Sequence, residues 1–314
     1  MRLTARLAVM SKYTLPLVLG ALCGGIALVN PVFLSLSNLF NILLQTTVIS
    51  VVAAGMTFVI ILGGIDLAVG SIVALCGILT GILLQAGTPA LVAAVPVLAA
   101  GATCGAVSGA LTGYGRVPPF VATLGMFGAA RGLALLLSDG RSISGFDGHF
   151  LALTSGTVLG IPLPIIVLVL VFVVSALFLR MTYWGIRIYA IGGNPRAAWL
   201  SGVNLGRYNI AVYAFSGLMS AVAALLLVSR LNAALPTAGM GYELDAIAAV
   251  VIGGATLSGG RGSVWGSLFG SLILAVLKNG LTILNVSSYF QQIVTGAVIV
   301  AAVLFDFDRR RSVE

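Results

Sequence analysis

The chain has 314 residues, a net charge of +8 and a mean hydropathy of +1.15. Hydrophobic residues make up 60% of it and charged residues only 8%, whereas about a quarter of the residues of a soluble globular domain are charged. This composition excludes a soluble domain and predicts an all-α, polytopic membrane protein. Nucleic acid is not an expected partner, because the basic residues lie at the ends of apolar segments, where membrane topology accounts for them.

Apolar stretches of about 20 residues, the length that crosses ~30 Å of hydrocarbon, recur along the chain. They predict about ten transmembrane helices, at 15–34, 45–62, 68–85, 89–112, 119–138, 161–179, 210–229, 244–256, 264–284 and 288–305. The eighth segment is short and glycine-rich, so one or two helices more or fewer fit the same pattern. The first segment resembles a signal peptide but lacks a cleavage site, and we expect it to stay as an uncleaved span.

The basic residues indicate the orientation, because Lys and Arg near span ends are retained in the cytoplasm. With N- and C-termini both cytoplasmic, most of them fall on that side: Arg2, Arg6, Lys12, Arg116, Arg180, Arg187, Arg196, Arg207, Arg261, Arg309, Arg310 and Arg311. Arg141 and Arg230 then lie outside, and Arg131 and Lys278 lie within spans, as partners for acids or as pathway groups. Residues 1–314 are predicted to form a single transmembrane domain.

The largest predicted periplasmic loop covers about 139–160 and is rich in glycine and serine. Its apolar residues suit packing against a partner or lying at the membrane interface. His149, the single histidine of the chain, lies here without a cluster of Cys, His or carboxylate residues, so no metal site is expected. Cys23, Cys76 and Cys104 lie in apolar spans with neither disulfide nor metal spacing and are expected to be packing residues.

The longest basic interruption between two spans is Arg180–Arg207, within a predicted cytoplasmic loop at about 180–209 that contains no acid. Its centre, residues 192–195, reads Gly-Gly-Asn-Pro, which breaks regular structure. Residues 196–202 can form two helical turns, started by Pro195 and stopped by Gly202. Such a helix either docks a soluble partner or is a connector at the lipid headgroups. The residues of interest are Arg187, Tyr189, Gly192, Gly193, Asn194, Pro195, Arg196, Ser201 and Gly202.

Many glycines recur at intervals of four. They form three predicted ridges: Gly101, Gly105, Gly109 and Gly113; Gly262, Gly266 and Gly270; and Gly77 and Gly81. Ridges of small residues let membrane helices approach closely. They serve either packing within one subunit or a face for a second copy.

Two glycine-rich breaks echo each other, since Gly63–Gly70 matches Gly253–Gly260 at four positions. Interrupted apolar segments at corresponding positions are typical of transporters. A functional or gating motif is therefore possible at Gly63, Gly64, Asp66, Gly70, Gly253, Gly254, Gly259, Gly260 and Arg261. The second break is not a nucleotide loop, because Gly260-Arg261 stands where Gly-Lys-Ser/Thr is required.

Asp66 is the only acid before Asp139. An ionisable group at membrane depth is a functional hypothesis by default. Two structural alternatives remain open. Asp66 either caps the helix that starts near Leu67 or pairs with an arginine at the cytoplasmic surface. The chain shows no catalytic triad, no nucleotide-binding domain and no cofactor motif.

Three long stretches carry a family resemblance: 55–75 (GMTFVIILGGIDLAVGSIVAL), 184–204 (WGIRIYAIGGNPRAAWLSGVN) and 243–303. In this order they resemble the membrane permease subunit of bacterial ABC sugar importers of the ribose/xylose/galactoside type. The resemblance covers most of the chain after about residue 40. It implies transport of a monosaccharide across the bacterial inner membrane, and not catalysis by this chain.

The resemblance also implies partners: a second permease copy or a related permease, a cytoplasmic ATPase, a periplasmic sugar-binding protein and the surrounding lipid. It implies that Tyr189–Ser201 belongs to the loop that contacts the ATPase. The rival hypothesis is an ion-coupled secondary transporter that uses Asp66. A structural membrane scaffold is a third class, and it requires no basic docking loop.

Overall fold

A computed structural model describes the backbone of residues 2–311 and the side chains of residues 14–298, 300 and 301. The basic side chains near both termini, predicted to be cytoplasmic, lie outside the described residues. In chain order the elements are α1 (Arg2–Val29), the 3-10 helix η1 (Pro31–Leu34), α2 (Leu36–Leu62), α3 (Val69–Gln85), α4 (Ala90–Gly113), α5 (Pro119–Ser138), β1 (Ile143–Ser144), α6 (Gly148–Ser155), β2 (Thr157–Val158), β3 (Ile161–Pro162), α7 (Leu163–Met181), α8 (Tyr183–Gly193), α9 (Pro195–Leu200), α10 (Leu205–Leu231), β4 (Ala233–Ala234), α11 (Tyr242–Ile252), α12 (Val264–Ile283) and α13 (Ser288–Arg311).

Each predicted apolar segment contains a helix, and the polytopic helical fold is confirmed. Among the described residues, 6 helices are long and apolar enough to cross a membrane: α2, α4, α5, α7, α10 and α12. The predicted eighth span is the main difference, because α11 has only 11 residues and ends at Ile252. At about 1.5 Å per residue, such a helix reaches roughly half way through the hydrocarbon. An irregular segment follows it.

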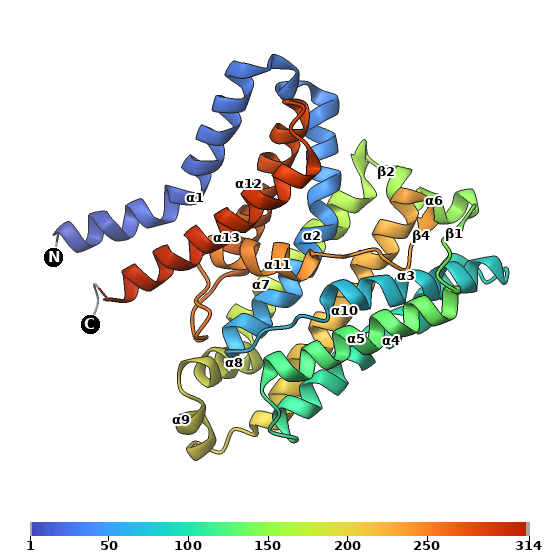
Figure 1. Cartoon of the computed structure of the whole chain (residues 1–314). Helices are drawn as coiled ribbons and strands as arrows, with labels where there is room; N and C mark the ends of the chain where they lie inside the picture. The colour runs from blue at the N-terminus through green and yellow to red at the C-terminus, as the bar shows by residue number, and fades with distance from the viewer. Residues whose placement is uncertain (1, 312–314) are drawn as a thin grey trace.

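Helix α2 is the centre of the molecule, and it contacts α7, α8, α10, α11 and α12. It starts at Leu36, earlier than the predicted 45, because Ser35 accepts a hydrogen bond from the Asn38 N–H at 3.4 Å. Every residue from Ser50 to Leu62 is buried. In Figure 1, α3, α4, α5 and α10 lie on one side of α2, and α1, α12 and α13 lie on the other.

The most extensive helix pair is α4 with α10, and the predicted ridge on α4 forms the contact. A methyl group on Gly101 would lie 2.5 Å from the Gly217 carbonyl oxygen, and one on Gly109 would lie 2.6 Å from the Asn209 carbonyl oxygen. Gly105 abuts the Tyr213 backbone, and Gly113 abuts Gly206. This ridge therefore packs within one chain. The second ridge does likewise, because Gly270 faces the backbone of α11, Gly266 faces Gly253 directly after α11, and Gly262 faces Ile61 and Ala255.

The segment 139–160, predicted to be a periplasmic loop, contains regular structure. It holds α6 and pairs β2 with β3, and β1 with β4 (Ile143 opposite Ala234). Phe146 and Phe150 are buried, with ring centroids 5.7 Å apart. These two aromatic residues thus pack into the chain's own core, whereas Leu159, 97% exposed, does not. His149 is exposed, and the described residues contain no group of His, Cys, Asp and Glu that could hold a metal.

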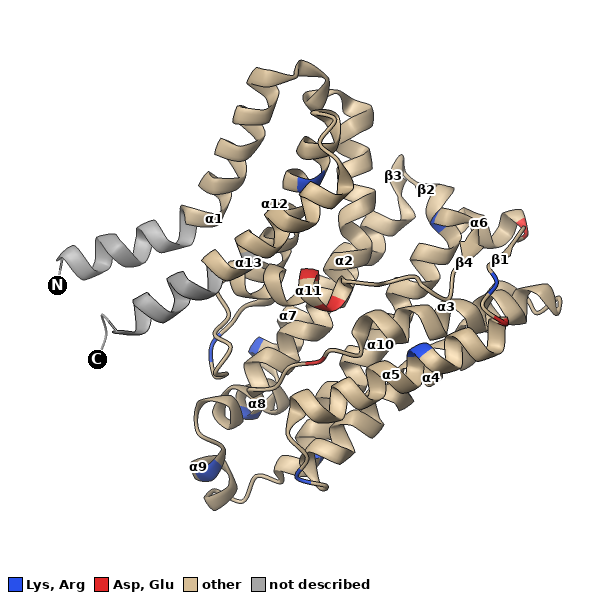
Figure 2. Cartoon of the chain, in the orientation of Figure 1, with Lys and Arg blue, Asp and Glu red and all other residues tan. Residues whose placement is uncertain are grey.

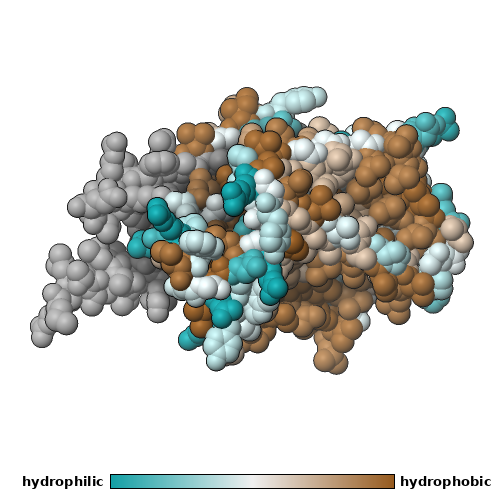
Figure 3. All heavy atoms as spheres, turned by 90° about the horizontal axis from the view of Figure 1, so that it is seen from below, coloured by the Kyte–Doolittle hydropathy of each residue, from teal (hydrophilic) through white to brown (hydrophobic). Residues whose placement is uncertain are grey.

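Basic residues concentrate at one end of the molecule. Figure 2 shows Lys and Arg at α8, α9 and the loops near them, whereas acidic residues lie at α11, before α3 and, together with basic residues, near α6 and β1. Seen from the side on which α8 and α9 project, hydrophilic residues form a patch beside a broad hydrophobic surface (Figure 3). Exposed large apolar side chains on α4, α5 and α7, such as Leu91, Leu136 and Leu170, match a surface that contacts lipid.

Gly105→Leu should prevent α4 from packing on α10, because the obstacle is the Tyr213 backbone and not a side chain that can rotate. We expect destabilisation beyond the roughly 1–3 kcal/mol of ordinary overpacking. The measurement is the thermal unfolding and size-exclusion profile of the detergent-solubilised protein. Gly24→Leu is the matched control, since no atom lies within 4 Å of that position. Equal stability of the two variants would show that the contact is not tight.

Candidate functional site

The basic segment folds into two short helices, α8 and α9, joined at Asn194. The Asn194 side chain accepts a hydrogen bond from the Ala197 N–H at 2.9 Å, and Pro195 occupies the first turn of α9. Gly202 follows α9 with φ +83°, a left-handed conformation that glycine adopts at low cost. The predicted start and stop of the short helix are confirmed. Helix α8 was not expected, because the glycines at its end suggested a break.

Helices α8 and α9 present a large exposed apolar surface. Tyr183 is 82% exposed, Trp199 62% and Leu200 71%. Arg196 and Ser201 are exposed beside them, although the Ser201 hydroxyl donates to the Ala197 carbonyl. Exposed aromatic and apolar groups together with arginine are typical of protein–protein interfaces. The exposed surface therefore suits a protein partner.

The base of α8 is held by polar and aromatic contacts. Tyr189 donates a hydrogen bond to the Gly262 carbonyl at 2.9 Å, and burial raises the pKa of its hydroxyl, which keeps it a neutral donor. Arg187 donates to the Tyr208 hydroxyl at 3.1 Å, and the ring of Trp184 lies 4.5 Å from that of Tyr208. These contacts join α8 to α10 and to the segment before α12.

Three glycine-rich segments that are far apart in the sequence meet at the end of α8. We call this contact the glycine junction, and it consists of Gly63, Gly192, Gly193, Gly259 and Gly260. A methyl group on Gly259 would lie 2.8 Å from the Gly63 Cα and 2.9 Å from the Gly192 carbonyl oxygen. One on Gly260 would lie 2.8 Å from the Gly193 Cα. The Gly260 N–H also donates to the Ile61 carbonyl at 2.9 Å. The backbones touch directly, and at Gly192, Gly259 and Gly260 there is no room for a Cβ atom.

The segment between α11 and α12 is an ordered turn. Thr256 donates from its hydroxyl to the Gly259 carbonyl at 2.9 Å, and its N–H donates to the Arg261 carbonyl at 3.1 Å. Gly254, Gly259 and Gly260 all have positive φ, at +89°, +86° and +74°. These turns present the 259–260 backbone to α2 and α8.

Asp66 lies in the buried segment between α2 and α3 and is 1% exposed. One carboxylate oxygen accepts from the Ala68 N–H at 3.0 Å, and the other accepts from the Ser216 hydroxyl at 2.8 Å. Within the described part of the chain it joins neither of the ion pairs, so pairing with an arginine is not observed. Ala68 directly precedes α3, and Asp66 thus performs a capping-like role and also ties this segment to α10.

The two predicted in-span cations bind within the protein. Lys278 on α12 lies 2.6 Å from a carboxylate oxygen of Asp245 on α11. Arg131 on α5 donates to the carbonyls of Pro236 and Ala238, at 2.7 and 2.9 Å. Both cations therefore fasten the segment around the start of α11.

The structure brings together only part of the predicted site. Gly63, Gly259 and Gly260 join the glycine junction, so the two echoing breaks are in contact there. The others do not join it: Gly64 faces Tyr213, Gly70 faces Gly239, Gly253 faces Gly266, Gly254 has open space, and Arg261 is exposed. Ser216 and Gly262, which sequence reasoning missed as partners of Asp66 and Tyr189, carry no local signal for these long-range contacts.

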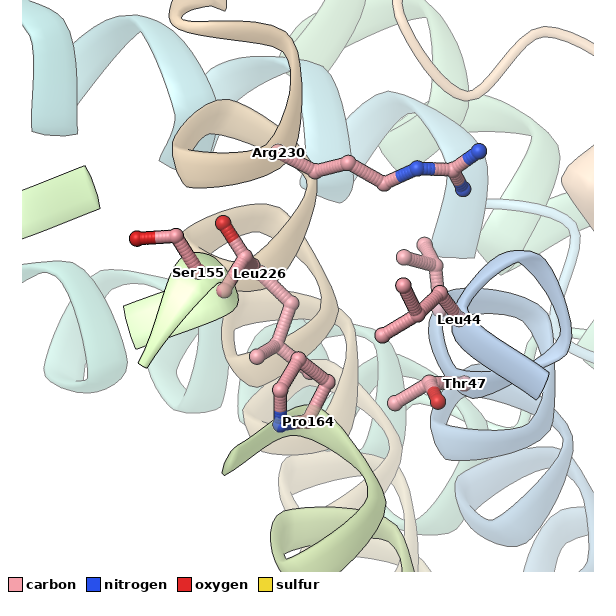
Figure 4. Close-up of a pocket in the computed structure, with 8 residues that line it drawn as sticks. Leu44, Thr47, Ser155, Pro164, Leu226 and Arg230 are labelled. Atoms are coloured by element: carbon pink, nitrogen blue, oxygen red, sulfur yellow. The ribbon is translucent and has the colours of Figure 1, made fainter. Parts of the chain in front are cut away.

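A separate hollow of about 230 Å³ lies between α2, α6, α7 and α10 (Figure 4). It is lined by Leu44, Thr47, Val48, Thr154, Ser155, Pro164, Leu226 and Arg230. Thr154 already hydrogen-bonds to Ser229 at 2.8 Å, and Ser155 to the Leu151 carbonyl at 3.0 Å. Arg230 extends across the opening (Figure 4). The lining is thus largely apolar with one cationic side chain.

Comparison with known proteins yields a clear match. The family described as "Branched-chain amino acid transport system / permease component" matches residues 38–303. The ribose import permease protein of Haemophilus influenzae is 45% identical over 285 residues, which are 90% of this chain and 88% of that protein. The ribose import permease protein of Bacillus subtilis is 46% identical over 283 residues, 90% and 88% of the two chains. The D-allose transport system permease protein of Escherichia coli is 38% identical, over 87% and 84%. No solved structure matches this chain.

Asp66→Asn should leave the fold largely intact, because the amide oxygen still accepts from Ala68 and the amide group can donate to the Ser216 hydroxyl. Asp66→Leu removes both interactions and leaves two buried donors unpaired, at about 1–3 kcal/mol each. We expect a much lower thermal midpoint for the leucine variant in detergent. Equal midpoints for the leucine variant and the unmodified protein would refute this structural role.

Proposed function

Because this chain belongs to the permease family of the branched-chain amino acid transport system type, we propose that it carries a pentose or hexose through the membrane. Its relatives include permeases for ribose and D-allose, and an L-arabinose ABC transporter permease of Azospirillum brasilense that is 36% identical over 91% of this chain. The chain is a multi-pass inner-membrane subunit of an ABC importer for sugar, as its resemblance predicted. It is a transport subunit and not the ATPase.

The proposed assembly has a cytoplasmic ATPase, a periplasmic sugar-binding protein and two permeases in the lipid bilayer. The two permeases are copies of this chain or this chain with a related one. The charge distribution supports an orientation with α8, α9 and both termini in the cytoplasm and α6 in the periplasm. In this arrangement the ten apolar helices make about ten passes, of which α11 is incomplete. Lipid covers α4, α5 and α7.

The observation that carries the proposal is the glycine junction beneath an exposed docking surface. The surface of α8 and α9 accepts the ATPase, while the end of α8 touches the end of α2 and the 253–262 segment. A displacement of α8 therefore acts directly on the central helix and on the connection between α11 and α12. Coupling of ATP binding to the pathway needs such a physical connection between the two sites.

In the proposed cycle, ATP binding closes the ATPase pair and moves α8 and α9. The pathway alternates between facing the loaded binding protein and facing the cytoplasm. Each partner must bind the two states with different affinity, because equal binding shifts no equilibrium. The permease needs only weak affinity for the sugar itself.

The ion-coupled alternative is not favoured. The relatives are ABC permeases, and both carboxylate oxygens of the buried Asp66 accept hydrogen bonds within the chain. A carboxylate held in this way stabilises the start of α3.

Arg196→Glu should uncouple ATP hydrolysis from uptake while leaving the protein in the membrane, because it reverses a charge on the docking surface. Gly193→Pro should act similarly through the end of α8. We expect at least a tenfold loss of sugar uptake in proteoliposomes that contain the ATPase and the binding protein. Arg196→Lys, which keeps the charge, is the control. Normal uptake by Arg196→Glu and Gly193→Pro would refute the docking role.

Gly260→Ala should impair uptake through the glycine junction. Its methyl group would press on Gly193, and its φ of +74° strains any residue except glycine. Gly254→Ala carries the same kind of strain at φ +89° but has no atom within 4 Å, so it controls for strain alone. We expect Gly260→Ala to transport at least fivefold less than Gly254→Ala at equal membrane abundance. Equal rates would mean that contact with α8 does not matter for transport.

A further inference from the structure

Helix α13 carries a polar stripe that packing explains only in part, because the Gln291 amide donates to the Thr282 hydroxyl at 3.2 Å and to the Val286 carbonyl at 3.0 Å. Ser288, Gln291, Gln292 and Thr295 recur at intervals of three and four, so they share one face of the helix. Tyr289 and Ile293, 82% and 66% exposed, lie on a neighbouring face. Within the described residues, Ser288 and Gln292 make no side-chain hydrogen bond. Polar side chains of membrane helices face the protein interior or a water-filled cavity.

The polar stripe lines a cavity of about 590 Å³ between α11, α12 and α13. This volume lies within the roughly 300–1,000 Å³ of small-molecule sites. The cavity is lined by Met240, Gly241, Leu244, Asp245, Lys278, Ser288, Gln291, Gln292, Thr295 and Gly296. Asp245 and Lys278 also line a smaller hollow of about 220 Å³, together with Gln45 on α2 and Arg230 on α10. The ion pair thus stands between two hollows that lead from α13 toward the central helix.

The ion pair makes the larger cavity polar without a net charge. The ammonium of Lys278 lies 2.7 and 2.6 Å from the two oxygens of Asp245. Each carboxylate oxygen can accept a further bond, and the ammonium can donate another. The amide of Gln292 offers both a donor and an acceptor. A charged ligand would find no uncompensated opposite charge there, whereas a neutral ligand with several hydroxyl groups would find partners for them.

One wall of this cavity is fixed in place. Arg131 binds the carbonyls of Pro236 and Ala238, which precede the lining residues Met240 and Gly241. Gly239 packs against the Gly70 backbone, where a methyl group would lie 2.5 Å from the Gly70 carbonyl oxygen. A supported rim holds polar groups in a constant geometry, as a binding site requires.

We propose that the cavity between α11, α12 and α13 is a binding station for the sugar, with Asp245, Lys278 and Gln292 contacting its hydroxyl groups. This inference rests on the proposed function and adds the place and chemistry of the contact. In the proposed topology the cavity lies toward the periplasmic end, since it adjoins the start of α11 and the last turn but one of α12. The station receives a neutral monosaccharide released by the binding protein. Its open, half-exposed walls suit brief contact and rapid release.

The first test is uptake of D-ribose, D-allose and L-arabinose by the complete complex in proteoliposomes. Gln292→Leu should lower the initial rate about five- to tenfold, because one partner of the sugar hydroxyls is lost. Gln85→Leu, the same change at an exposed position at the end of α3, should transport normally. Co-purification of the ATPase with each variant checks assembly.

The outcomes separate the two hypotheses. If the unmodified complex transports neither these three sugars nor any other pentose or hexose offered to it, the proposed function is refuted. If it transports one and Gln292→Leu equals Gln85→Leu, the binding station alone is refuted.

A second test does not depend on a loss of activity. The three native cysteines are replaced by alanine, and Gln292→Cys or Ile293→Cys is introduced. A hydrophilic, membrane-impermeant thiol reagent should modify position 292 at least tenfold faster than position 293, and the transported sugar should slow the reaction at 292 during turnover. Equal rates at the two positions would show that lipid covers the stripe, and a rate at 292 unaffected by sugar would overturn the station.

Discussion

Direct contact between backbones is the constraint on which this structure depends. The chain has 40 glycines, and at several contacts no side chain fits between the elements. The α4 ridge lets α4 lie against α10, and the glycine junction lets α2, α8 and the 253–262 segment touch. Apolar packing alone gives membrane helices little reason to associate, since lipid is equally apolar. Close approach replaces that missing driving force with dispersion contacts and fixed geometry.

Much of the fold could be predicted because the bilayer imposes a length and an orientation on every segment. The apolar stretches located the helices, and Pro195 and Gly202 predicted the bounds of α9. Long ordered motifs indicated the permease family. The errors have physical causes: apolar length does not distinguish a crossing helix from the short α11, and the glycine and serine content of 139–160 concealed the burial of Phe146 and Phe150.

The sequence indicated several residues of the candidate site, but it did not indicate how they are arranged in space. The two echoing breaks were visible in the sequence, yet nothing local shows that Gly63 and Gly259 meet at the end of α8. The polar stripe on α13 has a helical period and was available to sequence reasoning. To recognise the stripe as the wall of a cavity required the positions of α11 and α12, because these helices form the other walls.

The composition of the glycine junction has a kinetic consequence. Packed side chains must change rotamers when two elements slide past each other, and each change has its own barrier. Glycine has no rotamers, so the contact at the glycine junction can shift without a rotamer change, and only the buried side chains of α8, such as Ile188 and Ile191, must repack. The glycine junction therefore adds little to the barrier for this movement. The rate of the movement is set by the partner that drives it and by the side-chain contacts of the helices elsewhere.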